Sequence, residues 1–230
     1  FTVVIRDIDS KVDFNLVKSC FLPFQEIQGF PNFFGVQRFG ITRPLTHLVG
    51  RHLVDGNFKQ AVMTYLTTVF EDEDSIENQS RKHLAQTNDT KQALNDFPDH
   101  LQFEKAMLNH LVRFPDDYVG ALKQLPMNLL TMFVYAYQSY LFNKMVSKRI
   151  QMGLPLDQAV EGDVVLPVRH GEILDEFIPV SSRNIDKVNK KLSKNKGYVS
   201  SILLGSDSTF SGGVMGEIEQ SIIEDEQIDH

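Results

Sequence analysis

The segment PNFFGVQRFG, residues 31–40, combines residue types that can bind a nucleobase and its phosphate. Its glycines let the backbone bend sharply or approach a ligand closely. Its phenylalanines offer flat faces on which a base can stack, and Arg38 offers a planar, permanently charged fork. The same composition also fits a buried aromatic loop in which Arg38 pairs with a carboxylate. The residues alone leave both interpretations open.

A basic stripe further along the chain is the second candidate for binding. Four lysines share one face of the helix expected over residues 182–194, and three apolar residues share another face. The lysines are Lys187, Lys190, Lys191 and Lys194, and the apolar residues are Ile185, Val188 and Leu192. Such a face can hold RNA phosphates. A merely solvated face is the alternative.

The composition limits the classes of protein that fit. The net charge of −7 argues against nucleic-acid binding, but eleven acids lie in residues 71–77 and 217–230. Without them, 19 acids remain against 23 Lys and Arg, a balance of +4, so RNA contact stays allowed. Cys20 is the only cysteine, which excludes an internal disulfide and a Cys-rich zinc site. His47 and His52 are spaced poorly for one metal on a helix.

The elements that must position these residues are mostly helical. The spacing of apolar residues and the capping residues predict helices over residues 13–24, 57–69, from 98 onward, 126–151, 182–194 and 215–225. Residues 74–94 are polar and show no clear apolar period. Strands are expected over residues 1–8, 163–168, 172–178 and 198–204. The apolar run 129–142 is too short to span a bilayer. The fold class is therefore α+β.

Residues 31–40 resemble the signature of the TruD pseudouridine synthases, whose usual form is Pro-Asn-Tyr/Phe-Phe-Gly-x-Gln-Arg-Phe-Gly. Further segments resemble the same family in its order: Arg43-Pro44-x-Thr46-His47-x-Val49-Gly50-Arg51, Tyr137-Gln138-Ser139-Tyr140-Leu141-Phe142-Asn143, Glu161-Gly162-Asp163, Gly205-x-Asp207-Ser208-x-Phe210-Ser211-Gly212-Gly213 and Gly216-Glu217-Ile218-Glu219. The resemblance covers essentially the whole chain.

The resemblance implies a domain organisation and an activity. Residues 1–43 would be part of a mixed α/β pseudouridine synthase catalytic domain, and residues 44–230 a largely helical TRUD insertion domain with a small β-region. The activity would be conversion of uridine at position 13 of tRNA to pseudouridine, with no metal or organic cofactor. We also expect a monomeric protein that binds tRNA and no membrane, and the single cysteine fits a reducing cytoplasm.

The resemblance also implies which residues meet the RNA. The substrate-binding residues would be Phe1, Asn32, Phe33, Gln37, Arg38 and Phe39. Phe1 takes the phenylalanine position of an Asn-x-Phe triplet, and in the family this phenylalanine stacks on the target uracil. Contacts to the RNA backbone are expected from Arg43 and Arg51 and from the four lysines of the stripe.

The family's nucleophile is an aspartate in a Gly-x-Lys-Asp motif, and no Lys-Asp pair occurs in this chain. We assign no catalytic residue here and expect that aspartate upstream of Phe1. Because the chain begins at Phe1, within an expected strand and not at a methionine, we expect it to be truncated. Because it lacks the aspartate motif, we expect it to be inactive by itself. The alternative is a non-catalytic helical module that binds RNA or protein.

Overall fold

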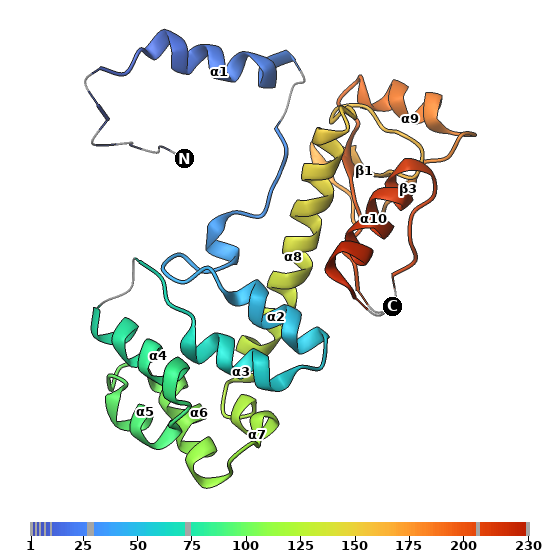
Figure 1. The fold of residues 1–230 in the computed structure, drawn as a ribbon. Coiled ribbons are helices and arrows are strands. Elements are labelled where there is room, and N and C mark those ends of the chain that lie inside the picture. The colour runs from blue at the N-terminus through green and yellow to red at the C-terminus, as the bar shows by residue number, and fades with distance from the viewer. Residues whose placement is uncertain are drawn as a thin grey trace. The chain divides into compact units, whose positions relative to one another are not determined.

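The computed structural model describes residues 2, 4, 6, 8–9, 11–26, 30–71, 75–205 and 208–228. Contacts divide the chain into two compact units. The first unit comprises Phe1–Asn32, Arg149–Ser200 and Ser211–Met215, and the second comprises Phe33–Lys148, Ser201–Phe210 and Gly216–His230. Helices dominate and a small antiparallel sheet is present, which confirms the α+β class (Figure 1).

The second unit is a bundle of helices around an apolar core. It contains η1 (Val36–Arg38), α2 (Thr46–Val54), α3 (Phe58–Thr67), α4 (Ser75–Thr87), α5 (Thr90–Asp96), α6 (Gln102–Arg113), α7 (Tyr118–Leu122) and most of α8 (Met127–Gln151). Helices α2, α3 and α4 contact one another in succession, and α7 packs on both α3 and α6 (Figure 1). Fully buried core side chains include Val49, Val62, Leu66, Leu84, Met107, Leu108 and Phe133.

Local sequence signals explain where several helices begin. Asn57 accepts a hydrogen bond from the Gln60 N–H and starts α3 as predicted. The longest helix, α8, begins directly after Pro126, also as predicted. The prediction of a helix from residue 98 is wrong, because α6 begins at Gln102 after a turn. Within the polar stretch at 74–94, residues 75–87 form α4 and residues 90–94 belong to α5.

The first unit contains the sheet and a helix that covers it. Strand β1 (Val164–Arg169) pairs antiparallel with β2 (Glu172–Ile173), β3 (Ile178–Pro179) and β4 (Gly197–Ser200). Helix α9 (Ile185–Leu192) contacts β4, and the small core consists of Ala159, Val165, Val180, Val188 and Leu192. The predicted helix 182–194 is thus shorter than expected, and the strand predicted at 198–204 ends at Ser200.

The prediction of one strand over residues 172–178 is wrong. Val168 faces Ile173, whereas Val164 faces Pro179, so the register slips by two residues between β2 and β3. The break lies opposite Pro167, whose carbonyl accepts from the Leu174 N–H but which has no N–H to return. A two-residue bulge therefore divides the hairpin's second arm.

Two glycine-containing segments of the first unit pack backbone against backbone. Gly162 has a φ of +92°, and a Cβ there would lie 1.6 Å from the Gly212 carbonyl oxygen. Nearby, Arg149 forms a buried two-pronged ion pair with Asp163, with N–O distances of 2.5 and 3.0 Å. Burial raises the pKa of Asp163, whereas the Arg149 guanidinium and the Val160 N–H act in the opposite direction. These motif residues have structural roles.

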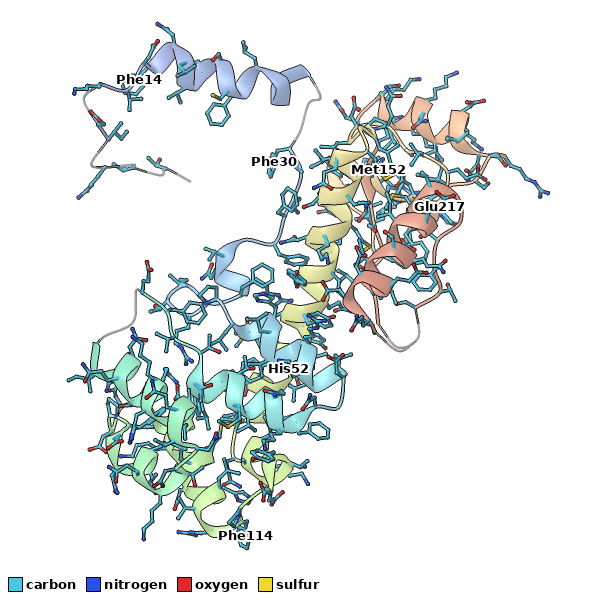
Figure 2. All side chains as sticks on the ribbon, in the orientation of Figure 1. Phe14, Phe30, His52, Phe114, Met152 and Glu217 are labelled. Carbon is cyan, nitrogen blue, oxygen red and sulfur yellow. The ribbon has the colours of Figure 1, made fainter. Side chains whose placement is uncertain are left out.

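The first and last helices complete the chain. Helix α1 (Phe14–Glu26) matches the helix expected over residues 13–24, and α10 (Gly213–Glu226) matches that expected over 215–225. Phe14 and Leu16 of α1 are 65% and 64% exposed. Figure 2 labels Phe14 at the start of this helix. Of the strand expected over residues 1–8, residues 1, 3, 5 and 7 lie outside the described residues. The described Thr2, Val4, Arg6 and Ile8 are not in a strand.

Candidate nucleic-acid interface

The loop over residues 31–40 is held to α8 through the backbone of Phe34. The Phe34 N–H donates to Asn143 Oδ1 at 2.9 Å, and Asn143 Nδ2 donates to the Phe34 carbonyl at 2.9 Å. One side-chain amide therefore satisfies both polar groups of a residue 109 positions away. The Phe34 ring meets the Phe142 ring edge-on, with centroids 5.5 Å apart. Apart from η1, the loop has no regular structure over its described residues, as predicted.

Arg38 is anchored on one side of its guanidinium. Its Nε donates to Ser139 Oγ at 3.0 Å, and its Cζ lies 5.5 Å from the centroid of the Phe34 ring. The Ser139 hydroxyl donates to the Tyr135 carbonyl at 2.8 Å, so its single proton is committed and it can only accept from Arg38. Within the described residues, Nη1 and Nη2 of Arg38 have no hydrogen-bond partner. A carboxylate partner for Arg38, the alternative left open above, is not found there either.

Phe39 meets the His47 ring edge-on, at the start of a series of ring contacts. Its ring centroid is 5.2 Å from that of His47, which stacks on Tyr140 at 4.9 Å. Burial lowers the pKa of His47, and the more distant Glu226 carboxylate acts weakly against this. Neutral imidazole therefore predominates near pH 7. His47 is a half-buried ring of α2, and its buried Nδ1 has no hydrogen-bond partner in the described part of the chain.

Gly40 allows the loop to turn into α2. Its φ is +109°, and a Cβ there would lie 2.1 Å from the Arg43 carbonyl oxygen, so only glycine fits. Immediately after this turn, the Thr46 N–H donates to the Phe39 carbonyl and its hydroxyl to the Arg38 carbonyl, both at 3.2 Å. These two hydrogen bonds connect the start of α2 to the end of η1.

The structure divides the predicted substrate-binding residues into two groups. Arg38 and Phe39 are partly buried, and their side chains contact the helices of the second unit. Asn32, Phe33 and Gln37 are exposed, with the Phe33 side chain 40% accessible. Phe1 lies outside the described residues, so its expected stacking on the target uracil stays a prediction. The exposed group offers an aromatic face and two amides, which suit stacking on a base and hydrogen bonding to its edge.

Arg43, a predicted contact to the RNA backbone, is bound inside the helical unit. Its Nη1 pairs with Glu104 Oε1 at 3.2 Å, and its Nη2 donates to the Tyr65 carbonyl at 2.7 Å. The fully buried Arg81 pairs with the same Glu104 oxygen at 2.9 Å and donates to the Leu66 carbonyl at 3.0 Å. The two arginines thus cap the carbonyl end of α3, which attracts cations. RNA would have to compete with these internal partners.

Arg51, the other predicted arginine, binds the end of α10. It donates to the Glu226 carbonyl at 3.1 Å, and its Nη1 lies 3.6 Å from Glu226 Oε2. Lys144 Nζ and the Tyr137 hydroxyl bind the same buried carboxylate at 2.6 and 3.3 Å. Burial, with the Glu226 charge, raises the pKa of Tyr137 well above its usual range, so the phenol stays a donor. Arg51 keeps 39% of its side chain exposed and is available in part.

The lysine stripe lies on the outer face of α9. Lys187 and Lys190 are exposed, whereas Val188 and Leu192 on the opposite face are buried against the sheet. Lys191 and Lys194, the latter just beyond the end of the helix, are also exposed. The amphipathic pattern is confirmed, and RNA binding by this face stays a prediction.

Ser139 and Asn143 are functional candidates that sequence analysis did not assign to the site, although both lie in the family-like segment over residues 137–143. They are four residues apart, so they lie one above the other on one face of α8. Ser139 is 2% exposed. The available signal was the presence of small polar residues, one turn apart, in an otherwise apolar run. Such buried polar side chains must have hydrogen-bond partners, but the sequence does not identify those partners.

The described residues also limit other kinds of site. Across those ranges, no group of three or more His, Cys, Asp or Glu side chains is arranged to hold a metal ion. None of the helices examined in the same ranges has the length and apolarity needed to cross a bilayer.

Comparison with known proteins agrees with this geometry. The family model for tRNA pseudouridine synthase D (TruD) matches residues 1–230. The chain is 38% identical over 230 residues to a "Probable tRNA pseudouridine synthase D" of Methanococcoides burtonii, covering 98% of this chain and 52% of that protein. A relative with the same description in Thermococcus onnurineus is 35% identical over 229 residues, covering 99% and 54%.

A solved structure extends the similarity to the fold. The crystal structure of a Methanosarcina mazei protein assigned to tRNA pseudouridine synthase D (TruD) superimposes with a TM-score of 0.89 and 37% identity. The match covers 94% of this chain and 50% of that one. The chain spans about half the length of the curated relatives it matches. The family match over the full chain, the identity and the shared fold together place this chain in the TruD family.

Proposed function

We propose that the protein to which this chain belongs is a tRNA pseudouridine synthase that isomerises uridine, at position 13 of tRNA, to pseudouridine. The observation that carries the proposal is the anchored loop over residues 31–40. It exposes Phe33 and Gln37, and Arg38 is fixed through Nε while no described residue hydrogen-bonds to its two terminal nitrogens. Family membership supports this function and not the alternative of a non-catalytic binding module.

The chemistry explains why such a loop is useful. The reaction detaches uracil from its ribose, rotates the base and rejoins it through carbon 5. A stacked uridine must first leave the folded RNA, at a cost of a few kcal/mol. An exposed aromatic ring and an arginine–phosphate contact offset that cost. We assign Phe33 to base stacking, Asn32 and Gln37 to base or ribose edges, and Arg38 to a phosphate. Phe39 would support the loop from behind.

The nucleophile of this reaction is not assigned to any residue of the chain. The family resemblance places it in a Gly-x-Lys-Asp motif, which has no counterpart here. We propose that residues 1–43 belong to the catalytic domain and residues 44–230 to the insertion domain. The exposed apolar residues of α1 support the first assignment, because Phe14, Leu16 and Leu22 are more than half accessible and suit packing against further structure.

The α9 lysines would contribute a second, nonspecific contact. Exposed lysines on one helix face bind phosphates mainly as point charges. They would attract tRNA to the first unit without selecting a base. A monomeric, cytoplasmic enzyme without a metal would suffice for these roles.

The test uses the complete reading frame that contains these codons. The purified protein is incubated with tRNA transcribed without modification, and pseudouridine is mapped chemically at each uridine. We expect pseudouridine at position 13. Absence of pseudouridine at every uridine, from a folded protein that binds tRNA, would overturn the synthase and favour the binding module.

The chain of residues 1–230 alone provides a second arm of the same test. We expect it to produce no pseudouridine, because it has no match to the aspartate motif. Activity above background would show that one of its own aspartates is the nucleophile.

A further inference from the structure

We propose that Ser139 and Asn143 of α8 are positioning residues for the RNA-binding loop, acting through Arg38 and Phe34. The inference rests on the proposed function and deepens it. Neither side chain would touch RNA. Together they would set the direction in which the Arg38 guanidinium meets a phosphate.

Asn143 fixes the backbone of the loop. Its amide both accepts from the Phe34 N–H and donates to the Phe34 carbonyl, at 2.9 Å each. A paired donor and acceptor leave the residue little freedom to rotate, because any rotation breaks one of the two bonds. The loop around Phe34 contains glycine and exposed residues, and apart from η1 it has no regular hydrogen bonding in its described part. A fixed point at Phe34 therefore orders a segment that sequence alone would leave variable.

Ser139 fixes the side chain that the loop carries. Its hydroxyl proton is used at the Tyr135 carbonyl, so its lone pairs are directed to Arg38 Nε at 3.0 Å. The guanidinium also lies over the ring of Phe34, the residue whose backbone Asn143 binds. Nε is the one guanidinium nitrogen that a two-pronged phosphate contact through Nη1 and Nη2 does not need. The anchor therefore leaves that pair of nitrogens for the ligand.

The consequence is preorganisation. A free arginine side chain loses rotamer freedom when it binds a phosphate, and this loss weakens binding. Here the loss occurs during folding, before RNA arrives. Removing the anchor should therefore affect the step in which the nucleotide is positioned, even though the guanidinium charge remains.

The decisive experiment is a double-mutant cycle in the complete protein. Ser139→Ala should lower kcat/KM about five- to tenfold, the size expected for one ordinary hydrogen bond, because the Arg38 charge itself remains. In an Arg38→Ala background, the same change should have no further effect, because the residue through which Ser139 acts is gone. Equal losses in both backgrounds would overturn the proposal.

Ser80 provides a matched control for Ser139→Ala. It is also a buried helix serine, 5% exposed, and its hydroxyl lies 3.0 Å from the Ile76 carbonyl four residues back and 2.8 Å from the Asp96 carbonyl. Ser80→Ala therefore removes a buried, hydrogen-bonded hydroxyl from α4. We expect Ser80→Ala to lower thermal stability at least as much as Ser139→Ala, but a loss of kcat/KM only for Ser139→Ala. Equal kinetic losses would reduce Ser139 to a general packing role.

The second arm does not depend on activity. In the complete protein without RNA, Asn143→Ala should accelerate hydrogen exchange at the Phe34 amide by about tenfold or more, because its acceptor is removed. Asn189 is the matched control, since it holds the Ala159 backbone in the same two-way manner, at 2.8 and 3.1 Å. Asn189→Ala should leave exchange at Phe34 unchanged.

The two arms separate the possible failures. If the wild-type protein forms no pseudouridine but the Phe34 amide responds to Asn143→Ala, the proposed function fails and the anchor stands. If pseudouridine forms and neither exchange nor kcat/KM responds to these changes, the positioning role fails and the function stands.

Discussion

Arg38 and Arg81 are both held by helices of the second unit, but their surroundings differ in kind. Arg81 is fully buried, and its guanidinium binds Glu104 and the carbonyl end of α3. Arg38 is bound at Nε alone by a neutral hydroxyl, among the described residues. The Glu104 carboxylate, shared with Arg43, partly neutralises the charge of Arg81, whereas no described carboxylate neutralises the charge of Arg38. An arginine anchored without being neutralised is therefore the better indicator of an anion site.

The largest expected effect concerns Arg81, the arginine that pairs with a carboxylate. Glu104→Gln keeps the side-chain shape but leaves Arg43 and Arg81 without their shared carboxylate. Breaking a buried ion pair in this way typically costs about 3–5 kcal/mol of unfolding free energy. Urea denaturation followed by circular dichroism measures the change. Asp99→Asn is the control, because Asp99 pairs with Lys105 at the surface with its side chain 98% exposed and should matter little. Equal effects of the two changes would contradict the assigned role of the network.

The next largest effect concerns Arg38, the arginine without a carboxylate partner among the described residues. Arg38→Ala should raise the barrier by about 1.5–3 kcal/mol, or roughly ten- to over a hundredfold in kcat/KM, for the loss of one charged partner. Stability should change much less than for Glu104→Gln, since Arg38 binds one neutral group. Steady-state kinetics on tRNA and a thermal melt provide both numbers. An unchanged kcat/KM would mean that the loop is only structural.

A smaller effect is expected from charges that are neither anchored nor neutralised. Replacing the four lysines of the stripe, Lys187, Lys190, Lys191 and Lys194, with Gln should weaken tRNA binding and flatten its salt dependence. The slope should fall by about 0.7 for each lost contact to single-stranded phosphate. Turnover at saturating tRNA should stay nearly constant. Binding measured at several salt concentrations decides the matter, because a wild-type slope would identify a merely solvated face.

The smallest effect concerns His47, a ring that supports the loop through Phe39. Burial lowers its pKa below the usual 6.5, so the unfolded chain binds more protons than the folded one in that range. His47 should therefore destabilise the fold as pH falls below 6.5. His47→Phe keeps the stacked ring and removes the titration, so its stability should depend less on pH between 7 and 5. Parallel slopes for the two proteins would exclude this contribution.

Sequence reasoning predicted most elements but not their interruptions. The starts of α3 at Asn57 and of α8 at Pro126 follow from local capping and proline geometry, which act over a few residues. The division of the strand predicted at 172–178 depends on Pro167 in the facing strand. A cross-strand partner is not visible in the segment that it interrupts.

Sequence predicted which residue types form the candidate site, but not which way their side chains point. The composition of residues 31–40 and the spacing of the α9 lysines identified two surfaces with suitable chemistry, because residue identity sets charge and aromaticity and helical period sets the face. Tertiary structure alone decided that Arg38 turns inward to Ser139 while Phe33 and Gln37 face outward. It also gave Arg43 internal partners. These choices depend on contacts such as Phe34 to Asn143, made across 109 positions, where packing of distant helices and not local preference selects the partner.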